Sequence, residues 1–117
     1  MENRRRLGTA YEERAAEYLC RKGYRILERN FRCRLGEIDL IAEECGVLVF
    51  LEVKYRKNNR YGSPAEAVTS AKQRTICRVA DFYRMSRRIP ESQSCRFDVV
   101  AIQGEQIEIY KDAFSYG

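Results

Sequence analysis

Apolar side chains in the first part of the chain recur at intervals of three and four residues. This is the spacing of one face of an α-helix, and Gly23 then supplies a typical signal for a helix end. The pattern therefore predicts a first helix over residues 7–19, with the face made by Leu7, Ala10, Tyr11, Arg14, Ala15, Tyr18 and Leu19.

Three segments rich in strand-forming residues follow this helix. They are YRILERNF at residues 24–31, EIDLIA at 37–42 and VLVFLEVKY at 47–55. The last two are separated by the turn-like EECG, so they are expected to form a hairpin. The pattern predicts three successive strands.

A polar connector, RKNNRYGSP, leads to a second helical pattern. Ser63, Pro64 and Glu66 have the form of a capping box with proline at the first helical position, so a helix is predicted to start there. Its apolar face runs through Ala65, Val68, Ile76, Val79, Ala80 and Tyr83, and Lys72 falls in the middle of that face.

The chain closes with two further strand patterns. RRIPESQSC ends the second helix, RFDVVAI is typical of a buried strand, and QGEQIEIYK is its expected hairpin partner. The predicted order is αβββαββ, in a single α/β domain over residues 1–117.

Composition places the chain among ordinary globular proteins, with 117 residues of which 44% are hydrophobic and 33% charged. No apolar run approaches the roughly 18 residues of a membrane span, and the basic start MENRRRLG lacks the apolar centre of a signal peptide. We therefore expect a cytoplasmic protein without a membrane partner.

The number and spacing of cysteines and the absence of histidine limit the kinds of catalytic and metal sites that the chain can form. The five cysteines have no pair closer than twelve positions, which favours free thiols over a disulfide framework or a zinc site. The absence of histidine excludes histidine acid–base catalysis and leaves carboxylates and lysine. A net charge of +5 indicates an anionic partner such as nucleic acid, or serves solubility alone.

The hairpin of residues 37–55 carries charged residues inside apolar runs. A tight turn at Cys45 and Gly46 sets Ala42 opposite Val49 and Leu40 opposite Leu51; it also predicts that Asp39 opposes Glu52 and Glu37 opposes Lys54.

Two opposed carboxylates repel each other unless a cation lies between them. Mg²⁺ (or Mn²⁺) bound by Asp39 and Glu52 would relieve this repulsion, and Lys54 would stabilise charge on a phosphate, which indicates phosphodiester hydrolysis. A solvated sheet face with cross-strand ion pairs is the alternative.

Five segments in this order, GEIDLIA, LVFLEVKYR, YGSPAEAV, KQR and RFDVVAI, resemble the YraN-like family of uncharacterised bacterial proteins. That family is itself similar to the PD-(D/E)xK nucleases of the Holliday junction resolvase type. The resemblance covers nearly the whole chain. It implies a restriction-endonuclease-like three-layer core, αβββαβ with a mixed central sheet, to which this chain adds a C-terminal strand.

The resemblance also implies site residues. Asp39 matches the motif aspartate, and Glu52 and Lys54 match the (D/E)xK pair. Glu12 matches the acidic residue that such folds supply from the first helix, with Glu13 as the alternative, since Tyr11 stands where the family usually has glycine.

Several other residues are candidates for nucleic-acid contact. Lys72 either reaches the site and holds a phosphate or extends past its neighbours to solvent. The loop residues Arg56, Lys57 and Arg60 are either solvated charges or contacts to a nucleic-acid backbone.

Two aromatic residues and a buried charge leave further alternatives open. Tyr55 and Tyr61 either stack on bases or pack at a strand end. Asp98, two residues from Arg96, is either structural or functional.

These observations favour a magnesium-dependent endonuclease acting on DNA, including branched or structured DNA. A nucleic-acid-binding module that keeps the fold without turnover, and a protein-interaction subunit, are the alternatives. RNA is an alternative substrate, and a homodimer would allow two chains to cut two strands.

Overall fold

The structure is a computed structural model that describes the backbone of residues 4–56 and 68–116 and the side chains from residue 10 onward within those ranges. Its two helices and five strands follow the predicted order αβββαββ. The elements are α1 (Arg4–Arg21), β1 (Arg25–Cys33), β2 (Gly36–Glu44), β3 (Val47–Tyr55), α2 (Ser70–Ser86), β4 (Cys95–Gln103) and β5 (Gln106–Phe114).

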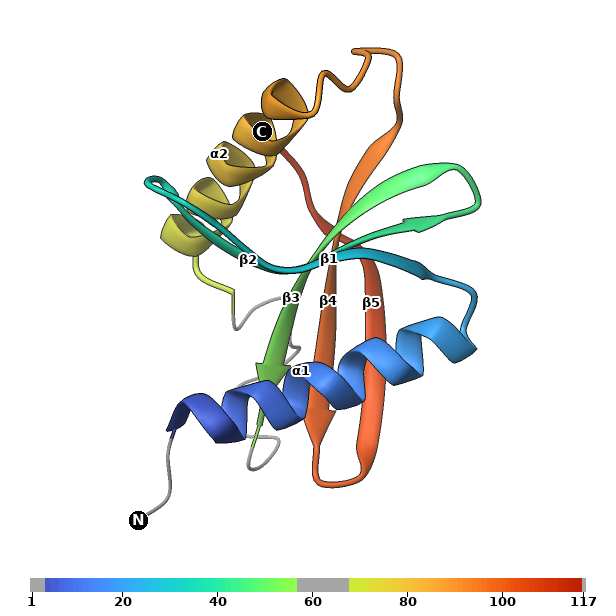
Figure 1. The fold of residues 1–117 in the computed structure, drawn as a ribbon. Helices are drawn as coiled ribbons and strands as arrows, with labels where there is room; N and C mark the ends of the chain where they lie inside the picture. Colours follow the sequence, from blue (N-terminus) through green and yellow to red (C-terminus); the bar gives the residue numbers. More distant parts are fainter. Residues whose placement is uncertain (1–3, 57–67, 117) are drawn as a thin grey trace.

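The strands form one mixed sheet in the order β1-β2-β3-β4-β5 (Figure 1). Neighbouring strands are antiparallel except β3 and β4, which are parallel and are connected through α2. A parallel pair needs such a crossover because the chain must return to the end of the sheet from which it started. The expected mixed sheet is confirmed.

The helices cover opposite faces of this sheet and define two apolar clusters. Ala15, Ala16 and Leu19 of α1 are fully buried against a set that includes Leu51 and Val100. Ile76, Val79, Ala80 and Tyr83 of α2 pack on the other face, against a set that includes Phe50 and Phe97. The result is the three-layer α/β/α core, with the added C-terminal strand, that the family resemblance implies.

The start of α2 differs from the prediction. Val68 lies in a bend, and Thr69 has an extended backbone and caps the helix, its hydroxyl accepting a hydrogen bond from the Lys72 backbone N–H at 3.1 Å. The helix that carries Lys72 and Ile76 therefore begins at Ser70, because a capping side chain there satisfies a free N–H group of its first turn. The predicted cap at Ser63, Pro64 and Glu66 lies outside the described residues.

The turn of the β1–β2 hairpin reaches across to α2 (Figure 1). Gly36, at the start of β2, has φ +147°, and a Cβ atom at this position would lie 2.7 Å from Cγ2 of Thr75. Glycine is needed here because any larger residue would meet the helix in a backbone conformation that L side chains rarely adopt.

Asp98 of β4 has a structural environment. It has no exposed surface and accepts hydrogen bonds from the Tyr24 hydroxyl at 2.8 Å, from Arg96 Nε at 2.9 Å and from the Asp112 backbone N–H at 2.9 Å. These donors satisfy the buried carboxylate, as a buried charge requires. The structural alternative for Asp98 is the one that the geometry favours.

The structure also bears on the predictions about the cysteines and about membrane spans. All five cysteines are free, as expected. Neither α1 nor α2, the helices of the described ranges, combines the length and the low polarity that crossing a lipid bilayer would require.

Candidate functional site

The site forms where β2 and β3 separate. Their ladder has the predicted register from Glu44–Val47 to Leu40–Leu51 and ends there. The predicted pairs Asp39–Glu52 and Glu37–Lys54 are therefore wrong as ladder partners. Instead, Asp39 Oδ2 accepts a hydrogen bond from the Val53 backbone N–H at 2.8 Å, so a side chain continues the contact where the backbones part.

The alternation of side chains between the two faces of the sheet is interrupted within β2, at the point where β2 and β3 separate near Asp39. Leu40 and Ala42 pack in the α1-side cluster, whereas Ile41 and Ile38 both pack in the α2-side cluster. Residues 41 and 38 would lie on opposite faces of a regular strand, so the alternation breaks between them. The first half of β2 consequently follows β1 towards α2 and leaves β3 at the point that carries Asp39.

Glu52 is the buried acid of the site, with 6% of its surface exposed. Its Oε1 lies 3.8 Å from the Lys54 Nζ and 4.0 Å from the Lys72 Nζ. Burial, followed by the charge of Asp39, raises the pKa of Glu52 to about 7, although both lysines act in the opposite direction. The structure thus brings Asp39, Glu52, Lys54 and Lys72 together, and Lys72 points at the site.

Glu12, from α1, is the second acid whose ionisation Asp39 opposes. Burial and the charge of Asp39 raise the pKa of Glu12, while a hydrogen bond with the Asn30 side chain lowers it. Glu13 instead pairs with Arg29 at 2.5 Å on the exposed surface of β1. The geometry therefore favours Glu12 over Glu13 as the α1 carboxylate of the site.

Asp39 itself has a raised pKa, chiefly because of burial. The hydrogen bond from Val53 and the charge of Lys72 lower it, and the charge of Glu37 raises it. Glu37 lies 3.0 Å from Arg32 of β1 in an exposed ion pair, so it stands at the margin of the site. Asp39 thus repels two other carboxylates, Glu52 and Glu12, and a cation beside Asp39 would relieve this repulsion.

The donor set fits a hard divalent cation held partly by substrate. Magnesium prefers oxygen ligands, keeps several waters and typically binds through one or two carboxylates together with phosphate oxygens. Asp39 and Glu52 supply such carboxylates. Over residues 10–56 and 68–116, no three Asp, Glu, Cys or His side chains form a group spaced to hold a metal on their own.

The structure describes only some of the residues that were predicted to contact nucleic acid. Arg56 directly follows β3 and its backbone N–H donates to the Ile102 carbonyl at 2.8 Å, next to the end of β4. Lys57, Arg60 and Tyr61 lie outside the described residues. Tyr55 ends β3 with 42% of its surface exposed and stacks on Tyr11 of α1.

Sequence reasoning missed Asn30, which positions Glu12. Asn30 has φ +54°, in the left-handed region that asparagine tolerates better than most residues, and it lies in β1 between residues paired with β2. An asparagine inside an otherwise strand-like segment was the available signal for an irregularity there. Its hydrogen bond to Glu12 could not be read from the sequence.

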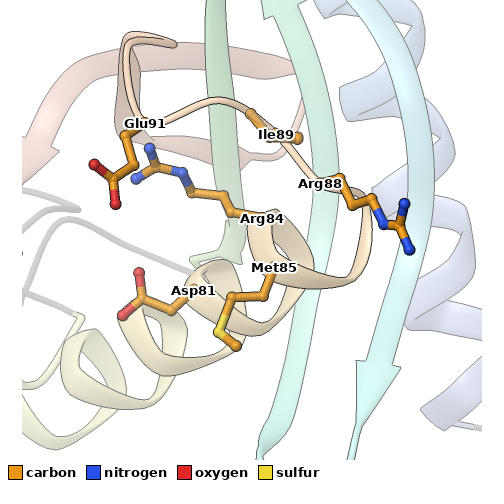
Figure 2. A pocket seen from close by; sticks show the side chains of 6 residues that line it. All are labelled: Asp81, Arg84, Met85, Arg88, Ile89 and Glu91. Atoms are coloured by element: carbon orange, nitrogen blue, oxygen red, sulfur yellow. The ribbon is translucent and has the colours of Figure 1, made fainter.

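A pocket lies away from these carboxylates, at the end of α2 (Figure 2). It has a volume of about 430 Å³, and its walls carry charges of both signs from Asp81, Arg84, Arg88 and Glu91. Arg88 points away from the other charged groups (Figure 2). The described residues that line this pocket include no lysine, so it does not repeat the arrangement of a buried acid beside two lysines that is found at Glu52.

Comparison with known proteins gives the family. Residues 11–102 match the model of the uncharacterised protein family UPF0102. A UPF0102 protein of Lachnoclostridium phytofermentans is 53% identical over 116 residues, covering 98% of each chain. One of Symbiobacterium thermophilum is 57% identical over 99 residues, covering 85% of this chain and 83% of that protein.

A more distant relative agrees over the full length. A UPF0102 protein of Vibrio parahaemolyticus is 42% identical over 117 residues, covering 98% of this chain and 97% of the relative. The match includes α1, β2, β3 and α2, the elements that carry the candidate site. The chain therefore belongs to the uncharacterised protein family UPF0102, the YraN-like family that its sequence resembles.

Proposed function

We propose that this protein is a metal-dependent endonuclease that hydrolyses phosphodiester bonds of DNA. The observation that carries the proposal is the buried Glu52, which lies within 4.0 Å of two lysine ammonium groups and beside a second carboxylate, Asp39, at the split between two strands. A structural ion pair needs one lysine, whereas phosphoryl chemistry uses several charges of both signs around one centre.

Each residue has a role in this proposal. Asp39 and Glu52 hold Mg²⁺ or Mn²⁺, and Glu12 assists from α1. The metal supplies Lewis-acid polarisation of the phosphate and lowers the pKa of a bound water. Lys54 stabilises the charge that develops on the phosphate, and Lys72, from the first turn of α2, holds a neighbouring phosphate oxygen.

The proposed partner is DNA, with branched or structured DNA included, and the proposed location is the cytoplasm. A net charge of +5 supports an anionic partner. Two competing proposals are a nucleic-acid-binding module without turnover and a protein-interaction subunit. A homodimer would let two such sites cut two strands.

The test is cleavage by purified protein of single-stranded, duplex, flap and four-way DNA, with and without magnesium or manganese. We expect metal-dependent cutting that Glu52→Gln or Lys54→Ala abolishes, while DNA binding changes by only a few fold, because these groups serve the transition state more than docking. Glu13→Gln is the matched control, since Glu13 pairs with Arg29 outside the site. Wild-type cutting by Glu52→Gln would refute the proposal.

The salt dependence of binding separates the competing proposals. Replacing Arg56, Lys57 and Arg60 together by alanine should weaken DNA binding across sequences and flatten the slope of log K against log salt by up to about three units, roughly one per phosphate contact. An unchanged slope would place the binding surface elsewhere. Absence of any salt-dependent binding by wild type would favour the protein-interaction subunit.

A further inference from the structure

Two tyrosines stack on each other at the edge of the candidate site. The ring centroids of Tyr11 and Tyr55 lie 4.2 Å apart, with 21° between the ring planes. Tyr11 belongs to α1 and is partly buried against the α1-side core, whereas Tyr55 is the last residue of β3 and keeps 42% of its surface exposed. One tyrosine thus holds the other against the protein while the second stays accessible.

The other aromatic contacts in the described ranges lie in or beside the α2-side core, and two of them include exposed rings, Phe82 and Tyr116. Those contacts gather around Phe97 and Tyr83 in the α2-side core, where the residues that they join include fully buried rings. The tyrosine stack lies on the opposite side of the sheet, at the end of a strand.

The two tyrosines are chain neighbours of the residues proposed for catalysis. Tyr11 directly precedes Glu12, and Tyr55 directly follows Lys54. The stack and the proposed phosphate contact are therefore carried by adjacent residues of the same elements, α1 and β3. Because side chains alternate along a strand, Tyr55 points to the α1 side while Lys54 points towards Glu52.

We propose that the Tyr11–Tyr55 stack is a platform for an unpaired base of the substrate strand beside the phosphate to be cut. The inference rests on the proposed nuclease function and adds a substrate class: DNA with a single-stranded nucleotide at the cleavage position, as in a gap, a flap or a branch. Bases in a continuous duplex already stack on their neighbours, whereas an unpaired base gains contact by stacking on an exposed ring.

The test compares binding of continuous duplex DNA with binding of the same duplex carrying an unpaired 2-aminopurine, in the absence of divalent metal so that no cutting occurs. Wild type should quench the 2-aminopurine fluorescence, since stacking on tyrosine quenches it. Tyr55→Leu should bind the unpaired substrate about tenfold more weakly, with duplex binding unchanged within about twofold, and should lose the quenching.

Two variants serve as controls. Tyr55→Phe keeps the ring and should behave as wild type. Phe82→Leu removes another exposed aromatic side chain, which lies on α2 with 38% of its surface exposed. This variant should bind both DNA substrates as wild type does. The quenching by wild type needs no variant, so it tests the platform even if Tyr55→Leu folds poorly.

The outcomes separate this inference from the function on which it rests. The platform would be overturned if Tyr55→Leu weakened binding of both substrates equally, or if wild type did not quench the fluorescence. Metal-dependent cutting by wild type in the same preparation would then still support the nuclease function. Absence of any DNA binding by wild type would overturn both.

Discussion

Asp39 does two things at once at the level of a single residue. Its Oδ2 accepts the Val53 N–H at 2.8 Å, which continues the contact between two strands after their ladder ends. Its charge also opposes ionisation of Glu52 and of Glu12. The hydrogen bond stabilises the fold, whereas the repulsion is a cost that serves the proposed cation.

Two substitutions at Asp39 separate these effects. Asp39→Asn keeps an oxygen acceptor for Val53 and removes the charge, so the metal-free variant should be as stable as wild type or slightly more stable. It should also lose most of the stabilisation that magnesium gives wild type, because a ligand stabilises through its affinity for the folded state. Thermal melts with and without several millimolar magnesium measure both effects.

Asp39→Ala is the companion variant. It leaves the partly buried Val53 N–H without its acceptor and should lower the free energy of unfolding by about 1–3 kcal/mol. If Asp39→Asn were as destabilised as Asp39→Ala in the absence of metal, the negative charge itself would be structural, and the assignment of Asp39 to a metal would fail.

The β1–β2 hairpin acts as a unit at the scale of elements. Its turn contacts α2 through Gly36, and this contact accompanies the departure of β2 from β3 at Asp39. α2 in turn delivers Lys72 from its first turn, which Thr69 caps. The hairpin and the helix therefore set two sides of the site, and their contact should influence both stability and the position of Lys72.

Gly36→Ala tests that contact. The new methyl group would lie 2.7 Å from Thr75 Cγ2 on a backbone with φ +147°, so we expect a loss of about 1–3 kcal/mol in the free energy of unfolding. Gly46→Ala is the control, since Gly46 has φ +80° and open space around it; it should show the backbone cost alone. Urea denaturation measures both.

A second substitution identifies the source of the loss. Thr75→Ser removes Cγ2 and keeps the hydroxyl that donates to the Ala71 carbonyl at 3.2 Å. In the Gly36→Ala background it should recover part of the lost stability. Strict additivity of the two changes would show that hairpin and helix do not meet at this point.

At the scale of the molecule, two groups of buried or partly buried charges in the described ranges have opposite consequences for stability. At the site, carboxylates face each other and burial raises their pKa values. In the network around Asp98, carboxylates face cations: Glu44 accepts hydrogen bonds from Arg96 at 2.5 Å and from Lys111 at 2.8 Å. The first set costs stability in the metal-free protein, and the second stabilises the joining of β2, β4 and β5.

The second set predicts acid sensitivity. The hydrogen bond from Lys111 holds the pKa of Glu44 below its usual value of 4.5. A carboxylate whose pKa is lower in the folded than in the unfolded state contributes stability that is present above the unfolded value and is lost as the pH falls through the folded one. Wild type should therefore lose stability between about pH 5 and pH 3.

Glu44→Gln should show a smaller loss over the same range, because it has no proton to gain at this position. Urea denaturation at the two pH values gives the difference. Glu43→Gln is the control, since Glu43 pairs with Arg25 on the exposed surface and such pairs contribute little. If wild type and Glu44→Gln lost the same amount of stability on acidification, Glu44 would not be the source of the acid sensitivity.

Local patterns determined the order of the elements and the register next to the β2–β3 turn, but not the start of α2. The turn at Cys45 and Gly46 predicted the Ala42–Val49 and Leu40–Leu51 pairs, because a tight turn fixes the pairing of the residues next to it. The spacing of residues along α2 likewise predicted that Lys72 lies on the apolar face, and the ion pair with Glu52 agrees with that.

Only the tertiary structure decided how the site is assembled. The pairs Asp39–Glu52 and Glu37–Lys54 fail because β2 follows β1 towards α2, where Gly36 lies against a helix almost forty residues later in the chain. The proposed role of Glu12 rather than Glu13 rests on the contacts of these two residues with Asn30 and Arg29 of β1. Contacts between distant segments have no local signal, whereas alternation and spacing are written in neighbouring residues.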